Sequence, residues 1–261
     1  LLDMYKIADF YIKILGVFND PFWGKFKSEN KKINLEIQIE QSSSTYYGME
    51  KCDIDLEYSQ CFRYGSQIMF VNSKWDKLKI FNTGCLEEIS AFLIQTFNSY
   101  VTFNKMLHMH SSLIKWKQFG LMFLGPSGIG KTTQAELWHK YRDALIINGD
   151  VVFVQETGDC FLGWGTPWHG SSPYCENTSV PVEALVVLKQ APENSIRELS
   201  GFEKVTAVSN SVFYPRWLEN GMELCLETLD HLLSALPVYE LSCRPDEEAV
   251  RLTEEAVFGR G

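Results

Sequence analysis

The residues Gly125-Pro-Ser-Gly-Ile-Gly-Lys-Thr132 have the types and spacing of a loop that binds phosphate. They match the pattern G-x-x-x-x-G-K-S/T, in which backbone N–H groups surround phosphate oxygens. In that pattern the lysine reaches the outer phosphates and the hydroxyl binds Mg²⁺. We therefore expect ATP and Mg²⁺ as cofactors, with Lys131 facing the ligand and not the core. The expected nucleotide-binding residues are Gly125, Pro126, Ser127, Gly128, Ile129, Gly130, Lys131, Thr132 and Thr133.

A carboxylate is needed beside such a loop, to hold Mg²⁺ or to take a proton, and Asp150 is the candidate. It ends Leu145-Ile-Ile-Asn-Gly-Asp150, an apolar strand followed by an acid about twenty residues past the lysine, which places the carboxylate at a strand end. The alternative interpretation is a plain turn, because Asn-Gly and Gly-Asp are both favoured in turns. Both interpretations can hold at once. Thr132 and Asp150 are the expected metal ligands.

His110 lies at the start of an expected strand pair, 111–124, that leads into the loop. If the pair is a hairpin, its beginning folds back beside the loop, where a histidine could contact the γ-phosphate or the incoming nucleophile. Otherwise His110 is a structural histidine. The candidate catalytic residues are Asp150, His110 and Lys131.

A second unusual stretch is Gly163-Trp-Gly-Thr-Pro-Trp-His-Gly170, which combines glycine, tryptophan and histidine. One interpretation is a surface turn that buried tryptophans anchor. The other is an active-site loop, with His169 or the backbone near the acceptor of the phosphate.

The elements that must position these residues form two groups. The first third alternates apolar and polar residues, which is typical of half-buried strands. From His108 onward, short apolar runs alternate with helical patterns. The expected strands are 5–15, 33–40, 53–58, 68–71, 78–81, 113–114, 121–124, 145–147, 151–154, 182–188 and 238–241. The expected helices are 86–106, which would link the two halves, 132–141, 217–236 and 246–257. We expect an α/β fold with a β-rich region at 1–105 and a nucleotide-binding domain at 106–261.

Composition and charge exclude several classes. The net charge is −9, so we expect neither nucleic acid nor a membrane as partner. The seven cysteines form no CxxC pair, which favours reduced, mostly buried thiols in a cytoplasmic protein over a metal site built from cysteines. No apolar run approaches the ~20 residues that a spanning helix needs.

The remaining classes of phosphate-loop protein differ in other motifs. Leu199-Ser-Gly201 faintly matches the signature of transport ATPases, but Phe202-Glu203 breaks it, so we interpret it as a helix-capping turn. A GTP switch is not expected, because no N-K-x-D or T-K-x-D motif is present. Small-metabolite kinases usually carry the loop near the N-terminus, unlike this chain.

The order of His110, the loop and Asn148-Gly-Asp150 behind a β-rich preface resembles HPr kinase/phosphorylase and its relatives, which share a nucleotide fold with phosphoenolpyruvate carboxykinase. Pro167-Trp-His-Gly170 and Tyr239-Glu-Leu-Ser-Cys-Arg-Pro-Asp246 resemble a smaller branch of HPr-kinase-like proteins. Some of that branch phosphorylate a serine of a precursor peptide, as lasso-peptide kinases do. The resemblance covers residues 105–258.

By this resemblance, His110 and Asp150 would assist proton transfer, while Lys131 and Thr132 would hold ATP and Mg²⁺. One departure is that HPr kinases have two adjacent acids where this chain has Gly149-Asp150. Another concerns the family's downstream arginine, for which Arg216 and Arg244 are the candidates.

The leading hypothesis is an ATP- and Mg²⁺-dependent kinase that phosphorylates a serine of a peptide or small protein. The alternatives are a kinase of a small hydroxylated metabolite and a nucleotide-binding regulator without catalysis, which the single acid would suggest; a homo-oligomer is left open. The β-rich region is either a supporting sheet or a lid or docking surface. In the second case a strand edge could bind peptide, and the loop 163–170 could form the opposite wall, with its Trp164 and Trp168 rings packing on the peptide.

Overall fold

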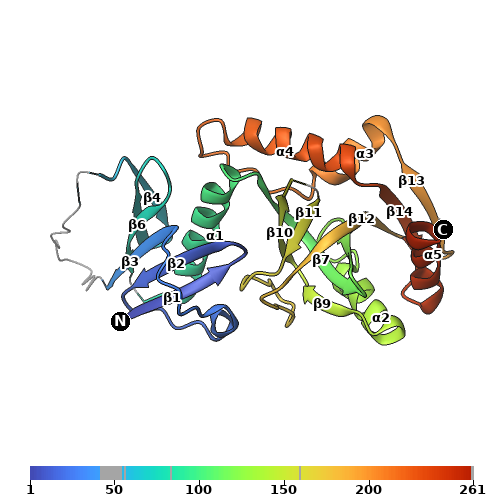
Figure 1. Cartoon of the computed structure of the whole chain (residues 1–261), viewed down its shortest axis with the longest axis horizontal. Coiled ribbons are helices and arrows are strands. Elements are labelled where there is room, and N and C mark those ends of the chain that lie inside the picture. The colour runs from blue at the N-terminus through green and yellow to red at the C-terminus, as the bar shows by residue number, and fades with distance from the viewer. Residues whose placement is uncertain (42–54, 56, 83, 159, 260–261) are drawn as a thin grey trace. The chain divides into compact units, whose positions relative to one another are not determined.

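The computed structural model describes residues 1–41, 55, 57–82, 84–158 and 160–259, and the chain forms two compact units (Figure 1). The units are Leu1–Val101 and Thr102–Gly261. Each has its own β-sheet together with helices, so the protein is a mixed α/β protein with two sheets.

The first unit is a six-stranded sheet in the order β1-β2-β3-β6-β5-β4. The strands β2, β3 and β6 are parallel, and the other neighbours are antiparallel. Their bounds are Leu2–Ile7 (β1), Phe10–Leu15 (β2), Leu35–Gln41 (β3), Gln60–Tyr64 (β4), Gln67–Val71 (β5) and Lys77–Asn82 (β6). A 3-10 helix covers Pro21–Phe26, and helix α1 covers Leu86–Thr102.

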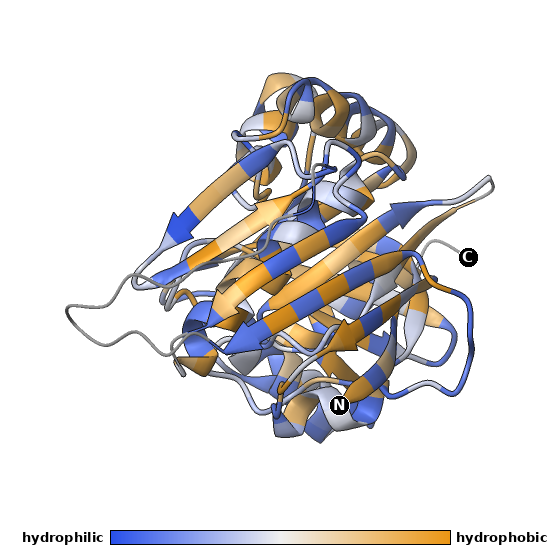
Figure 2. Ribbon diagram, turned by 90° about the vertical axis from the view of Figure 1, so that its left-hand side faces the viewer, coloured by the Kyte–Doolittle hydropathy of each residue, from blue (hydrophilic) through white to orange (hydrophobic). Residues whose placement is uncertain are grey.

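Alternation of apolar and polar residues makes these segments strands. In β3 the residues Leu35, Ile37 and Ile39 are buried, while those between them are partly exposed. Such alternation appears in Figure 2 as bands of orange and blue along individual strands. Helix α1 packs on the sheet, since the rings of Phe97 and Phe10 are 6.1 Å apart. The buried face of β2 therefore has a partner within the unit.

Three expectations for this unit need correction. The segment 5–15 is not one strand but a hairpin, because the chain turns between Ile7 and Phe10, with Ala8 at φ 53°. No glycine marks this turn, so the apolar pattern reads as continuous. The expected helix 86–106 ends at Thr102, and Met106 already belongs to the next strand. The strand expected at 53–58 falls outside the described residues, apart from 55, 57 and 58, which are not in a strand.

The second unit is an eight-stranded sheet, mainly in the order β11-β10-β7-β8-β12-β14-β13, with β9 paired to β7. The strands β8, β12 and β14 are parallel, so their carboxyl ends meet at one edge. The strand bounds are Met106–Trp116 (β7), Phe119–Leu124 (β8), Leu145–Asn148 (β9), Val151–Glu156 (β10), Phe161–Trp164 (β11), Ser179–Gln190 (β12), Ser195–Leu199 (β13) and Val238–Cys243 (β14). The helix bounds are Lys131–Arg142 (α2), Gly201–Ser209 (α3), Gly221–Ala235 (α4) and Glu247–Phe258 (α5).

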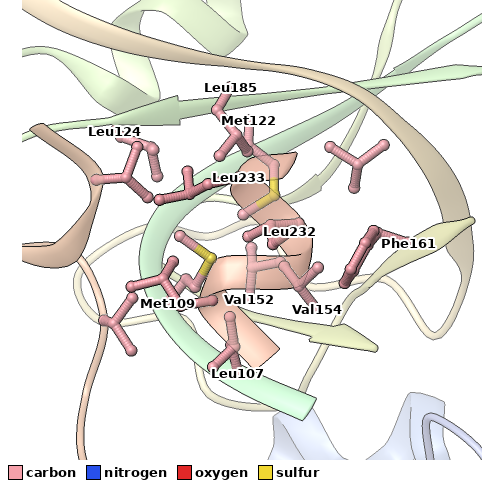
Figure 3. Packing of buried hydrophobic residues seen from close by; sticks show 14 of the residues in the cluster. Leu107, Met109, Met122, Leu124, Val152, Val154, Phe161, Leu185, Leu232 and Leu233 are labelled. Carbon is pink, nitrogen blue, oxygen red and sulfur yellow. The ribbon is translucent and has the colours of Figure 1, made fainter. Parts of the chain in front are cut away.

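Helices cover both faces of this sheet. On one face, Leu232 of α4 packs in one cluster with strand residues such as Met122 and Leu124 (Figure 3). Leu229 of α4 and Val208 of α3 belong to the same cluster. On the other face, Trp138 of α2 and Val250 of α5 pack on Phe123 and its neighbours. Since Met122, Phe123 and Leu124 alternate between the faces, one short strand supports both cores. The loop that follows Leu124 therefore begins at a strand end that is packed on both faces.

Several boundaries in the second unit differ from the sequence prediction. Helix α4 begins at Gly221 and not at Trp217, because a series of tight turns occupies 214–220. The strands β11 and β13 and helix α3 were not expected as elements. Ser200 is the N-cap residue of α3, so the interpretation of Leu199-Ser-Gly201 as a helix-capping turn is confirmed.

Two further observations concern the described residues as a group. None of their helices is long and apolar enough to cross a membrane. Their six cysteines are free thiols, of which Cys175, Cys225 and Cys243 are buried. The expectation that most thiols are buried was too strong, since Cys61 and Cys160 are exposed.

Candidate active site

The glycine-rich loop connects β8 to α2, as its sequence predicts. Three glycines have positive φ, which side-chain-bearing residues rarely adopt: Gly125 at 138°, Gly128 at 78° and Gly130 at 114°. Gly130 is also the N-cap residue of α2, so the first N–H groups of the helix lack intrahelical partners next to the loop. Ser112 of β7 anchors this helix start, because its hydroxyl donates to the Lys131 carbonyl over 2.9 Å. The result is a loop whose N–H groups and helix end can bind an anion.

Lys131 is more enclosed than its sequence position indicates. The sequence predicts a side chain that faces the ligand and not the core, but only 6 % of the residue is exposed. Its ammonium donates to the carbonyls of Gly125, at 3.1 Å, and Pro126, at 3.2 Å. Burial lowers the pKa of Lys131, and the nearby Asp150 carboxylate opposes that shift. The ammonium thus lies against the loop and within electrostatic range of Asp150.

His110 and Asp150 form a hydrogen-bonded pair beside the loop. The strands β7 and β8 are a hairpin in which Ser111 pairs with Leu124, so His110 returns to the base of the loop. Strand β10 lies on the other side of β7, and His110 pairs with Val151. The His110 Nε2 atom is 2.9 Å from Asp150 Oδ1. An ionised carboxylate only accepts hydrogen bonds, so this nitrogen carries the proton.

The Asp150 carboxylate stays ionised because its surroundings stabilise the charge. The hydrogen bond from His110 is the main cause of its lowered pKa, and Lys131 adds to the effect, while burial opposes it. The structure therefore places the three candidate catalytic residues together.

Asn148 fixes the turn that carries Asp150. It is completely buried, and its Oδ1 accepts from the N–H groups of Asp150 and Val151, both at 2.9 Å. Its amide nitrogen donates to the carbonyls of Thr166, at 3.1 Å, and Trp168, at 2.9 Å. The turn interpretation and the functional interpretation of this segment are therefore compatible. Sequence reasoning did not identify Asn148 as the residue that holds this turn. The signal for it is an Asn at the end of an apolar strand, directly before Gly-Asp.

Two glycines allow the loop after β11 to approach this turn. A Cβ at Gly149 would lie 1.9 Å from Ser172 Oγ, so this loop fills the space where a second acid would stand. A Cβ at Gly170 would lie 2.2 Å from Asp150 Oδ2. Thr132 joins the turn from the other side, because its hydroxyl donates to the Gly149 carbonyl over 3.1 Å. The candidate metal ligands Thr132 and Asp150 thus flank the same residue.

The Trp168 residue contributes its backbone carbonyl to the turn that carries Asp150, and its ring is buried. Trp168 is only 7 % exposed, and its ring centroid is 6.3 Å from that of Phe153. The expectation that the rings of this loop form a wall for a peptide is therefore wrong for Trp168, whereas Trp164 is partly exposed. The His169 ring contacts the Ser172 carbonyl, which braces the loop. Burial of Trp168 depends on a residue of another strand, which the local sequence does not reveal.

A hollow of about 530 Å³ lies beside the loop, where β8, β12 and β14 end. Gly128–Gly130 and Thr133 form one wall. Residues 190–192 and 243–245 form the other, with Arg244 at the rim, where it contacts Asp246 and the Pro192 carbonyl. Ligands of α/β sheets bind at such strand ends. The hollow can therefore take the group attached to a phosphate that the loop binds, and sequence reasoning had no signal for it beyond Arg244.

His108 is a buried histidine that the sequence interpretation missed. It is 4 % exposed and lies between the rings of Phe153, at 4.7 Å, and Phe213, at 4.4 Å. Within the described part of the chain, neither ring nitrogen has a hydrogen-bond partner. Burial lowers the pKa of His108 to about 3, so the ring is neutral at physiological pH. The spacing H-x-H places it on the same face of β7 as His110.

This burial makes stability depend on pH. His108 has a pKa near 6.5 in the unfolded chain and about 3 in the folded one. Its neutral form therefore contributes fully to the free energy of unfolding above pH 6.5, and this contribution decreases as the pH falls below that value. Between pH 7.5 and 5.5 the wild type should lose about 1.4 kcal/mol of unfolding free energy more than a His108→Phe variant, which keeps an aromatic ring between the two phenylalanines. Urea unfolding at both pH values measures the difference. Equal losses in the two proteins would show that His108 is not held neutral.

Comparisons with known proteins give little beyond this geometry. No family model matches the chain, and no curated protein matches it. Among solved structures, one match is the HPr(Ser) kinase/phosphatase from Coxiella burnetii, at 10 % identity and a TM-score of 0.35. The match covers 57 % of this chain and 95 % of that one. A likeness this distant carries no argument about activity, so the function must be inferred from the site itself.

Proposed function

We propose that the protein is an ATP- and Mg²⁺-dependent kinase that transfers the γ-phosphate to a serine hydroxyl of a peptide or small protein. The observation that carries the proposal is the position of the His110–Asp150 pair, beside Lys131 and the glycine-rich loop. Phosphate transfer needs an anion cradle, a cation on the outer phosphates and a carboxylate near the acceptor. These residues supply all three. The nucleoside would lie in the hollow at the ends of β8, β12 and β14.

The donor set fits Mg²⁺. Among the described residues, no group of three or more His, Cys, Asp or Glu is arranged to hold a metal alone. Mg²⁺ commonly uses one or two carboxylates together with phosphates and waters. The Thr132 hydroxyl and the Asp150 carboxylate are hard oxygen donors of this kind, and they flank Gly149. When bound, Mg²⁺ would neutralise charge on the phosphates.

In the proposed reaction the serine Oγ forms a bond to the γ-phosphorus, and the bond from that phosphorus to the β–γ bridging oxygen breaks. ADP leaves with the electron pair of the broken bond, and Lys131 stabilises its charge. The serine proton passes to Asp150, whose carboxylate has lone pairs beyond the one that accepts from His110. His110 holds the carboxylate in place.

An assay with ATP labelled at the γ-phosphate tests the proposal. We expect transfer of label to serine in a library of short peptides, and loss of transfer when Mg²⁺ is chelated. Phosphoserine is identified by mass spectrometry. Transfer only to small alcohols such as glycerol would instead support a metabolite kinase, and ATP binding without transfer to any hydroxyl would support a regulator.

A further inference from the structure

The first turns of α4 carry an apolar surface that the fold does not use. Met222 and Leu226 are one helical turn apart and are 39 % and 49 % exposed. They line a hollow of about 760 Å³ together with Arg216, Leu218, Glu223 and Glu227; we call it the α4 hollow. Trp217, 36 % exposed, lies in the turn before the helix. Contiguous exposed apolar side chains are a feature of interaction sites.

The charges around the α4 hollow have one dominant sign. Glu223 and Glu227 are one turn apart, and Asp230 follows them on the helix. Helix α4 contains no lysine or arginine. Within the described ranges, none of these three carboxylates forms an ion pair. Like charges one turn apart destabilise a helix, so a cationic partner would relieve this repulsion. Arg216 is the single basic residue of the lining.

The chain segment 213–221 connects the candidate active site to the α4 hollow. The Phe213 ring is 6.1 Å from the His110 ring, and the Phe213 N–H donates to the His108 carbonyl over 2.9 Å. Two residues later, the Pro215 carbonyl lies 2.7 Å from where a Cβ of Gly221 would stand, so the start of α4 folds back onto this segment. Arg216, which lines the α4 hollow, is three residues after Phe213, and three residues span at most ~10 Å. Together with the separation of the two rings, this places the edge of the hollow roughly 16 Å from His110.

We propose that the α4 hollow binds a segment of the acceptor peptide that carries both basic and apolar side chains, about five residues away from the serine that is phosphorylated. The inference rests on the proposed function, because it takes the His110–Asp150 pair as the place of transfer. Leucine-like side chains of the segment would pack on Met222 and Leu226. Lysine or arginine would face Glu223 and Glu227. An extended spacer of about five residues, at ~3.3 Å per residue, would reach from the edge of the α4 hollow to His110.

Binding can be tested separately from phosphate transfer. The probes are two fluorescein-labelled peptides with one serine, a five-residue Gly-Ala spacer and a leucine-containing segment. One peptide has lysine at the polar positions of the segment, and the other has glutamate. Fluorescence anisotropy with the full chain and without ATP should give a Kd about tenfold lower for the lysine peptide, at low salt. In the double variant Glu223→Lys/Glu227→Lys, the glutamate peptide should bind more tightly.

A matched control removes the effect of net charge. The double variant Glu29→Lys/Glu183→Lys changes the charge equally at exposed positions elsewhere, and it should keep the wild-type preference. Equal losses in both double variants would overturn the inference, as would a wild type that does not distinguish the peptides. With ATP, shortening the spacer to one residue should reduce the phosphorylation rate at least fivefold. Failure of transfer with intact, α4-dependent binding would count against the proposed function and not against the docking site.

Discussion

The variant Asp150→Asn should lose at least 10²-fold in the rate of phosphate transfer, the usual cost of removing a general base or metal ligand. Asparagine keeps the shape of the side chain, and its carbonyl oxygen can still accept the proton of His110 Nε2. It cannot take the serine proton, and it is a weaker Mg²⁺ ligand. Since Asp150 contributes little to the nucleotide pocket, ATP affinity should stay within about tenfold.

Single-turnover transfer from labelled ATP measures the rate, and calorimetry measures the affinity. The matched control is Glu183→Gln, which neutralises an exposed carboxylate on β12 and should leave both values unchanged. His110→Gln, which keeps the carboxylate but removes the ring, should have a smaller effect than Asp150→Asn. Near-normal turnover in Asp150→Asn would assign the base to another residue, with His110 the first to test.

The core of the site follows from local sequence signals. The conformation of the loop Gly125 to Thr132 depends on neighbouring residues alone, because its glycines adopt positive φ and a helix starts directly after them. The position of His110 follows from a hairpin between adjacent strands, and the position of Asp150 from a strand that ends beside them. Each step needs only short-range periodicity and the rule that ligands bind at strand ends. These signals were enough to predict that His110 and Asp150 lie beside the glycine-rich loop.

Other features depend on which distant segments meet. The hollow beside the loop requires β12 and β14 to lie next to β8, and nothing in the sequence of these strands names the partner. The burial of Trp168 requires Phe153, and that of His108 requires Phe213 as well. The sequence leaves open whether the tryptophans of the segment 163–170 are buried anchors or part of an active-site loop, and the packing of Trp168 on Phe153 shows that this ring is buried. The sequence also shows no reason for Ser172 to fill the space beside Gly149.

The Lys131 ammonium holds the glycine-rich loop by hydrogen bonds, and in the proposed function it also binds the outer phosphates. Lys131→Met removes the ammonium but keeps most of the buried stem, which Lys131→Ala would not. It deletes the hydrogen bonds to the carbonyls of Gly125 and Pro126 in the glycine-rich loop. Loss of a buried, hydrogen-bonded charge costs about 2–5 kcal/mol toward a charged ligand, so ATP·Mg²⁺ affinity should fall at least ~30-fold. Phosphate transfer should be abolished.

The change at Lys131 must be separated from damage to the fold, because the residue is 6 % exposed. Lys140→Met, on the exposed side of the same helix α2, is the matched control and should bind ATP like the wild type. Urea unfolding should place both variants within about 1 kcal/mol of the wild type, since the methionine side chain fills the lysine stem's volume. If calorimetry then finds unchanged ATP affinity in Lys131→Met, the loop does not hold the phosphates. In that case the pair of His110 and Asp150 would have to act on a ligand bound elsewhere, and the kinase proposal would fail at its first step.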